Sequence, residues 1–229
     1  MKKVYLFLLL CIASVGVKAQ TAASYTFSRS TGTYASISGT GTPFTGINCD
    51  DCGAGGIPLG FTFTFCGVGY STVAVCSNGW LSLANYVSSN YPAYATNIGS
   101  AGWLFPFWRD DHGGYGGSTN YYQTTGAVGS RVFIFEWNNW DGFGYSTWDM
   151  NIQIKLYEGS NIIQFCYGSS NSTNTDFGVG IGNSTTDFQN LPTATSSTCV
   201  SSMPCCSGST GLPSSGSILQ WSLCSPVLS

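Results

Sequence analysis

The only histidine of the chain, His112, directly follows two adjacent aspartates, Asp110 and Asp111. An imidazole beside carboxylates can act as an acid/base pair or contribute ligands to a metal site. Catalysis by a serine nucleophile would need His112 as its general base, and the chain has no Gly-x-Ser-x-Gly turn to expose such a serine. We therefore expect His112 to be a polar loop residue without a catalytic role.

Two carboxylates on predicted strands, Glu136 and Asp149, offer a second kind of chemistry. A glycosidase requires two carboxyl groups that face each other across a cleft, and both residues have aromatic neighbours, in "FEWNNWDG" and "TWDMN". Isolated carboxylates on strands more often lie on the solvated face of a sheet. We expect no enzymatic activity, and a polysaccharide hydrolase is the least favoured alternative.

Two acidic doublets lie in predicted loops, Asp50-Asp51 and Asp110-Asp111. Calcium takes carboxylate and carbonyl oxygens from flexible loops, although the chain has no EF-hand spacing. Asp110 and Asp111 are the better candidates, because the predicted buried strand "LFPFW" directly precedes them. We expect no required cofactor, and calcium at Asp110 and Asp111 is the one ion that the sequence suggests.

Aromatic residues in predicted loops are the main candidates for ligand binding. Tyrosine with serine, asparagine and glycine makes adaptable contact surfaces, and exposed rings can stack on sugars. The alternative is that these rings cover the ends of the fold. The candidates, from "GGYGGSTNYYQ" and "NNWDGFGYSTW", are Tyr115, Tyr121, Tyr122, Trp140, Phe143 and Tyr145.

The elements that must position these residues are strands, because apolar residues recur with a period of two and not at helical spacing. In "GFTFTF" (60–65) phenylalanines alternate with threonines, and "RVFIFEW" (131–137) and "TWDMNIQIKLYEG" (147–159) alternate in the same way. The other predicted strands are 71–77, 79–83, 162–168, 177–182, 217–223 and "LFPFW", with Pro106 confined to an edge or bulge. We predict an all-β, antiparallel sandwich or jelly roll of about 10–12 strands.

Cysteine usage suggests an oxidising compartment. Lys2 and Lys3, the apolar run Val4–Val17 and the small residues before position 20 predict a signal peptide over 1–19. Nine cysteines follow it and read as disulfide candidates, with at least one left unpaired. They are Cys49, Cys52, Cys66, Cys76, Cys166, Cys199, Cys205, Cys206 and Cys224. We expect disulfides to staple two loops, at about 38–58 and 189–216, within a single domain over 20–229.

Charge limits the choice of partners. The formal net charge of −3 becomes −6 without the lysines of the predicted signal peptide, Lys2, Lys3 and Lys18. Nucleic acids and anionic membrane surfaces attract basic patches, so both are poor partners for this chain. After the signal peptide no apolar segment is long enough to span a membrane.

The order of several segments resembles a known extracellular domain. "IPLGFTFTFCGVGYSTVAVCSNGWLSL", "LFPFWRDD", "MNIQIKLYEGSNIIQFCYG" and "FGVGIGN" follow in turn. They resemble the repeated β-sandwich domain of exported surface proteins of Bacteroidota and, more distantly, the nidogen-type extracellular domain. The resemblance implies a sandwich in adhesive, matrix or surface proteins and brings no catalytic residues.

We therefore expect a secreted or cell-surface protein for adhesion or for structural assembly. Its aromatic loops would bind an extracellular glycan, a protein surface or copies of the chain itself. A carbohydrate-binding module is the main alternative.

Overall fold

The computed structural model describes residues 20–85, 102–114, 116–173, 177–184, 186–193, 196–200 and 211–223. The predicted signal peptide lies outside these residues, as do Tyr115, Cys205, Cys206 and Cys224. Apart from one short 3-10 turn, η1 (Ala22–Ser24), the regular elements are strands. In chain order these are β1 (Tyr25–Thr31), β2 (Thr42–Pro43), β3 (Gly53–Phe65), β4 (Val68–Cys76), β5 (Trp80–Ser82), β6 (Trp103–Trp108), β7 (Asp111–His112), β8 (Thr119–Thr125), β9 (Val132–Gly142), β10 (Tyr145–Tyr157), β11 (Ile163–Ser170), β12 (Gly178–Ser184), β13 (Asp187–Thr193), β14 (Ser196–Val200) and β15 (Ser217–Leu223).

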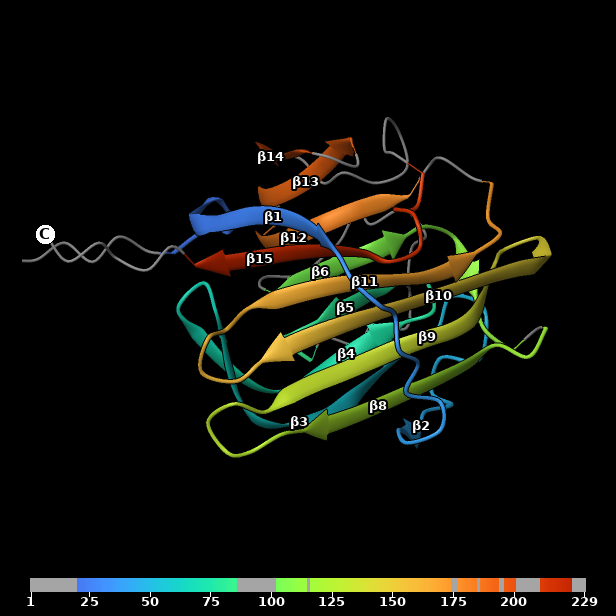
Figure 1. Ribbon diagram of the computed structural model, residues 1–229, viewed down its shortest axis with the longest axis horizontal. Helices are drawn as coiled ribbons and strands as arrows, with labels where there is room; N and C mark the ends of the chain where they lie inside the picture. Colours follow the sequence, from blue (N-terminus) through green and yellow to red (C-terminus); the bar gives the residue numbers. More distant parts are fainter. Residues whose placement is uncertain are drawn as a thin grey trace, which may run out of the picture.

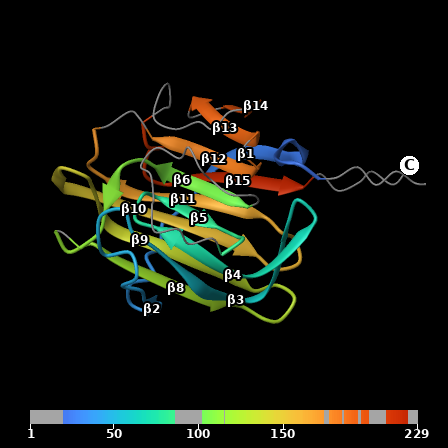
Figure 2. The ribbon, with the colours of Figure 1, turned by 180° about the vertical axis from the view of Figure 1, so that it is seen from behind.

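The strands form two antiparallel sheets that pack face to face. The first has the order β1-β15-β11-β10-β9-β8-β2, with β7 paired to β9, and the second has the order β14-β13-β12-β6-β5-β4-β3. Figure 1 looks onto the first sheet and Figure 2, from behind, onto the second. The predicted all-β antiparallel sandwich is confirmed.

Strand alternation builds the core, as the sequence predicted. Phe61, Phe63 and Phe65 are buried while the threonines between them are less so. The inward faces of β9 and β10 add a second layer of large side chains, Phe133, Phe135, Trp137, Ile152, Ile154 and Leu156. Full burial of one such side chain contributes about 1.5–3 kcal/mol. The two alternating faces thus supply one continuous core between the sheets.

The stretch "LFPFW" is confirmed as a buried strand, with Pro106 at a bulge. All six residues of β6 are buried, and its register against β12 shifts between Phe105 and Trp108. The free carbonyl of Pro106 accepts a hydrogen bond from Tyr167 Oη at 2.7 Å. The missing N–H of proline therefore coincides with an interruption of the ladder.

Both predicted cysteine-containing loops hold strands that the sequence did not reveal. Segment 38–58 contains β2 and the start of β3, and segment 189–216 contains most of β13 and all of β14. These stretches are rich in glycine, serine and threonine, so they lack the large alternating side chains that mark a strand. For the same reason the predicted count of 10–12 strands is too low.

The disulfide expectation is right for one pair and wrong for three cysteines. Cys49 and Cys52 form a disulfide. Cys66, Cys76 and Cys166 are free thiols, on the β3–β4 turn, in β4 and in β11. Cys76 and Cys166 belong to different sheets, and burial raises the pKa of both thiols. Cys76 packs in an apolar cluster with Trp80, Trp103, Phe105, Trp108 and Phe188, so packing and not cross-linking accounts for its burial. The expectation of at least one unpaired thiol is confirmed.

Residues 32–41, which we call the crossing segment, run over the outer face of the first sheet. In Figure 1 the blue chain leaving β1 passes in front of this sheet to reach β2. Tyr34 Oη and the Ile37 N–H donate to the two carboxylate oxygens of Glu136, both at 2.7 Å. Gln153 Nε2 donates to the Ala35 carbonyl at 2.8 Å. Glu136 is 0 % exposed, so this carboxylate anchors the segment.

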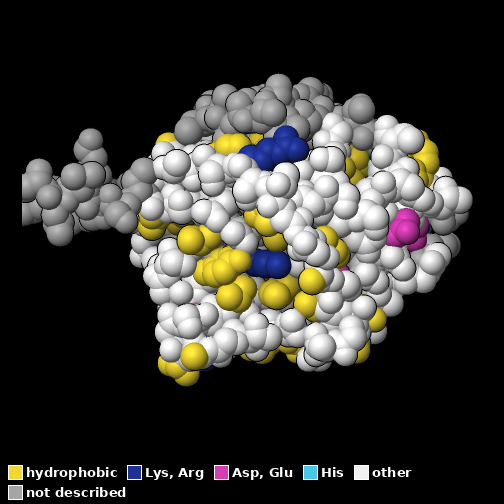
Figure 3. All heavy atoms as spheres, in the orientation of Figure 1, with side chains coloured by type: hydrophobic (Ala, Val, Ile, Leu, Met, Phe, Trp, Pro, Cys, Tyr) yellow, Lys and Arg dark blue, Asp and Glu magenta, His cyan; other side chains and the backbone are white. Residues whose placement is uncertain are grey.

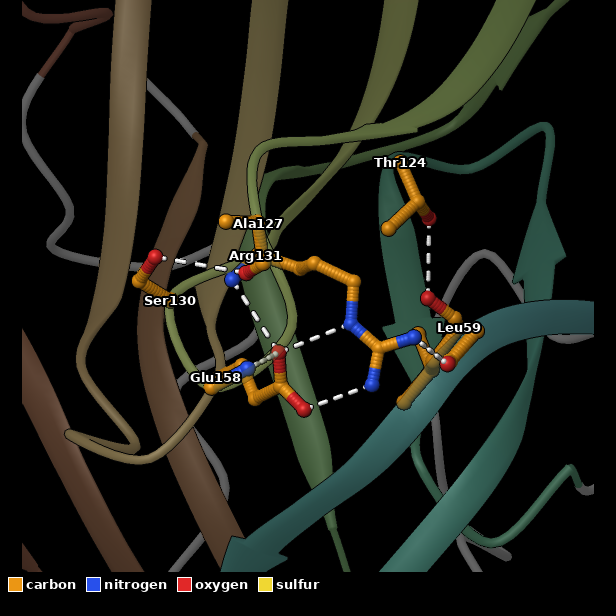
Figure 4. A network of polar contacts seen from close by, with 8 residues as sticks. Leu59, Thr124, Ala127, Ser130, Arg131 and Glu158 are labelled. Atoms are coloured by element: carbon orange, nitrogen blue, oxygen red, sulfur yellow. Dashed lines mark hydrogen bonds and ion pairs between the residues drawn. The ribbon is translucent and has the colours of Figure 1, made fainter.

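Two side chains connect the first sheet to β3, the strand at one end of the second sheet: Thr124 from β8 and Arg131 from just before β9. Arg131 forms a bidentate ion pair with Glu158, and its Nη1 donates to the Gly60 carbonyl at 2.5 Å (Figure 4). Thr124 Oγ1 donates to the Leu59 carbonyl at 2.8 Å. β3 has no partner residues in β4 between Pro58 and Phe63, so these donors take the place of strand pairing.

The outer face of the first sheet carries few charged side chains. Figure 3 shows hydrophobic side chains gathered beside a basic one on this face. The composition agrees, because only 7 % of the chain is charged. Neutral polar side chains must therefore solvate most of this surface.

Candidate functional site

A groove of about 680 Å³ opens at one end of the sandwich. It lies between the Cys49–Cys52 loop, β7 and the turn that joins β9 to β10. We call it the end groove; its lining residues are Asn48, Cys49, Asp50, His112, Gly113, Gly114, Phe143, Gly144 and Tyr145. Its volume is within the range of about 300–1,000 Å³ that is usual for ligand sites.

The acidic side of the end groove is held by a rigid loop. The disulfide between Cys49 and Cys52 encloses Asp50 and Asp51, and Asp51 adopts a left-handed φ of 49°. Asn78 Nδ2 donates to the Asp51 carboxylate at 2.7 Å. Asp50 forms an isolated bridge with His112, which ties the loop to β7.

Three carboxylates converge beside this loop. Asp50, Asp51 and Asp110 each offer an oxygen within 4.8 Å of the others. The Asp110 carbonyl accepts the Phe143 N–H at 3.0 Å, which joins this acidic cluster to the aromatic side of the groove. Partial burial, followed by the negative charges of Asp51 and Asp50, raises the pKa of Asp110.

The aromatic side consists of Phe143 and Tyr145, which flank the turn at Gly144. They are 48 % and 47 % exposed. The Tyr145 ring stacks on Trp148, with 4.4 Å between ring centroids and 10° between planes. The Arg109 guanidinium carbon lies 5.1 Å from the Trp148 ring centroid and 5.5 Å from that of Tyr145. Stacking and cation–π contact therefore fix the Tyr145 ring before any ligand arrives.

Glycines allow the chain to close the floor of the groove. A Cβ on Gly113 would clash with the Trp140 indole, and one on Gly114 would lie 2.9 Å from the Asn48 carbonyl oxygen. Gly114 also has a φ of +93°, in the region that glycine favours. The backbone of "HGG" thus packs directly against residues 47–48.

A buried carboxylate lies next to the groove. Asp141 pairs with His112 across β7 and β9 and is 0 % exposed. Neither of its carboxylate oxygens has a hydrogen-bond partner among the residues that the structure describes. Burial raises the pKa of Asp141 to about 6, and the charge of Asp149 acts in the same direction, while His112 lowers it.

A model of the NIDO-related family matches residues 24–223. The chain belongs to the NIDO-related family. This membership agrees with the predicted likeness to the nidogen-type extracellular domain and supports an extracellular setting. No curated protein and no solved structure matches the chain. Within the described residues of this NIDO-related domain, no helix is long and apolar enough to cross a membrane.

Only part of the predicted aromatic set belongs to the end groove. Phe143 and Tyr145 line it. Tyr121 and Tyr122 are consecutive residues of β8, and neither lines the end groove. Tyr115 is outside the described residues. The prediction that Trp140 is an exposed loop residue that binds a ligand is wrong. β9 continues through Gly142, which buries this indole completely, and Trp140 Nε1 donates to the Ser77 carbonyl at 2.9 Å.

The predicted pair of calcium ligands is divided by the fold. Asp111 is 0 % exposed in β7, because "DH" pairs with β9 instead of forming an exit loop. Asp110 joins Asp50 and Asp51, the other acidic doublet of the sequence. Calcium stays a prediction, now for this cluster and not for Asp110 with Asp111.

Sequence reasoning missed Asn48, Gly113 and Gly114 as groove residues. Two consecutive glycines after a charged segment favour a turn with positive φ, and this pattern could have indicated Gly113 and Gly114. The position of the groove depends on pairing between β7 and β9, which joins residues about 30 positions apart. Local periodicity carries no information about such a contact.

Proposed function

We propose that this NIDO-related domain is a non-catalytic extracellular binding module that uses the end groove for adhesion or surface assembly. The observation that carries the proposal is the pair Phe143 and Tyr145, two large rings that are nearly half exposed at the edge of a groove. Among the residues that the structure describes, Phe143 and Tyr145 are the two most exposed aromatic side chains, and the other rings are buried or partly buried. Large rigid rings supply contact area at a low entropic cost, which favours a binding role.

A carbohydrate ligand is the second candidate. The stacked arrangement of Tyr145 on Trp148 favours it, because a fixed aromatic ring is a suitable surface for the apolar face of a sugar. The polar groups of Asn48 and Asp50 on the other side of the groove would accept hydrogen bonds from hydroxyl groups.

A hydrolase is the least supported alternative. Glu136, the carboxylate that might act in a glycosidase, is buried, and both its oxygens accept hydrogen bonds from the crossing segment. Asp149 is exposed on β10 and does not line the end groove. Glycoside hydrolysis requires two carboxyl groups that face each other across a cleft, and the positions of Glu136 and Asp149 give that hypothesis no support.

The test is an adhesion assay with residues 20–229 immobilised on beads, using extracellular matrix proteins, cell surfaces and a glycan array as targets. We expect the double variant Phe143→Ser/Tyr145→Ser to lose binding to each target that the unmodified chain binds. Tyr121→Ser, in β8 and outside the groove, is the matched control and should bind normally. Full binding by the double variant would contradict the proposal.

A further inference from the structure

We propose that the end groove receives a cationic side chain, a lysine ammonium or an arginine guanidinium, from the surface of a partner protein. This inference rests on the proposed function, because it assigns a ligand chemistry to the same groove. Its basis is that the lining of one groove contains two exposed aromatic rings and Asp50, which is one member of a cluster of three carboxylates.

The first argument is charge. Asp50 lines the groove and belongs to the cluster with Asp51 and Asp110, whose oxygens approach within 4.8 Å of one another. Burial and the negative charges of Asp51 and Asp50 raise the pKa of Asp110 more strongly than the positive charges of Arg109 and His112 lower it. The Arg109 Nη1 donates to the Asp110 backbone carbonyl at 3.2 Å. The cluster therefore keeps negative charge that an incoming cation would neutralise.

The second argument is the aromatic side. Cations are attracted to the faces of aromatic rings, and Phe143 and Tyr145 both expose about half of their surface. The structure already uses this interaction within the same stack, where Arg109 lies over Tyr145 and Trp148. A second cation on the groove side would contact a ring on one side and a carboxylate on the other.

The third argument is preorganisation. The disulfide fixes the acidic loop, Trp148 fixes the Tyr145 ring, and Gly113 and Gly114 pack the floor against residues 47–48. Little conformational freedom remains to be lost on binding, which favours a specific ligand. Anionic ligands such as uronic acids or sulfated sugars would be repelled by the carboxylates. A neutral sugar would bind without using their charge.

The experiment is an NMR titration of residues 20–229 with the peptide Gly-Arg-Gly, and with the same peptide carrying citrulline in place of arginine. Citrulline has nearly the shape of arginine but no charge. We expect the arginine peptide to shift the amide signals of Asp50, Gly114, Phe143 and Tyr145, and to bind at least about tenfold more tightly than the citrulline peptide. Raising sodium chloride from 20 to 300 mM should weaken binding of the arginine peptide only.

Variants separate the two sides of the groove. Asp50→Asn/Asp110→Asn should lower the affinity for the arginine peptide about tenfold, and Phe143→Leu/Tyr145→Leu should lower it as well. Asp149→Asn, which removes an exposed acid on β10 outside the groove lining, is the control for loss of a negative charge elsewhere and should leave the affinity unchanged.

Equal binding of the two peptides, no binding of either, or binding that ignores Asp50→Asn/Asp110→Asn would overturn the inference. The proposed function fails separately. If Phe143→Ser/Tyr145→Ser abolishes adhesion while Asp50→Asn/Asp110→Asn adheres normally, the groove binds its target but the ligand is not a cation.

Discussion

The anchoring of the crossing segment by Glu136 predicts a large and specific loss of stability when this carboxylate is changed. Glu136 is 0 % exposed and accepts two hydrogen bonds of 2.7 Å, from Tyr34 Oη and from the Ile37 N–H. A hydrogen bond to a charged group contributes about 1.5–3 kcal/mol. In Glu136→Gln the amide oxygen can still accept one of these bonds, but the NH2 group faces the other donor.

We therefore expect Glu136→Gln to lower the free energy of unfolding by about 2–3 kcal/mol, the cost of one such bond and one unsatisfied buried donor. For a domain of this size that corresponds to a fall in Tm of roughly 5–10 °C. Tyr34→Phe removes only the hydroxyl donor and should cost about 1.5–2 kcal/mol. Because the two residues share one bond, the double variant should be more stable than additivity predicts, by about 1–2 kcal/mol.

The measurements are guanidinium unfolding followed by tryptophan fluorescence, calorimetry, and limited proteolysis within residues 32–41. Thr40→Ala is the matched control, since it removes an exposed hydrogen bond from the same segment to Gln123 and should cost less than about 0.5 kcal/mol. The reasoning is refuted if Glu136→Gln unfolds like the unmodified chain, or if Tyr34→Phe and Glu136→Gln are additive.

Three further results are expected. Asp141→Asn should stabilise the protein at pH 8, because the raised pKa of about 6 means that ionised Asp141 is unfavourable in the fold. The rise from 3.8 sets an upper bound of about 3 kcal/mol on this gain, which should vanish below about pH 4 in calorimetry. Arg131 lowers the pKa of Glu158 from 4.5 to about 2, so the stabilisation that this ion pair contributes is complete above pH 4.5 and is lost as the pH falls toward 2. Glu158→Gln should remove that part of the acid sensitivity in melting curves recorded from about pH 5 to 2. Trp140→Ala should destabilise the fold by about 3–5 kcal/mol, whereas Phe143→Ala should change chemical unfolding little; the opposite order would contradict their assigned burial.

The sequence predicts the fold well wherever large side chains alternate. Ranges 131–137, 147–159 and 217–223 fall on β9, β10 and β15, because a period of two reports directly which face of a strand is buried. The short strand β7 was missed, since Asp111 and His112 have the composition of a loop. What makes them a strand is the edge of β9, an environment that only the assembled sheet provides.

The candidate site was predicted in its residue types but not in its arrangement. Phe143 and Tyr145 were recognised because two rings beside Gly144 suggest a turn. Trp140 was assigned to the same loop because the polar and glycine residues around it do not show that β9 continues to Gly142. The convergence of Asp50 and Asp110 requires both the disulfide and the bridge to His112, so it is a property of the tertiary structure.

The contacts from Arg131 and Thr124 to β3 have a consequence for association between molecules. β3 ends its sheet, and an unpaired strand edge is a template on which another chain can add a strand. The carbonyls of Leu59 and Gly60 already accept hydrogen bonds from these two side chains, so an incoming strand would find them occupied. A strand from another molecule that added along β3 (Gly53–Phe65) would therefore be interrupted at Leu59 and Gly60, so the molecule's own side chains limit how far such a strand can pair.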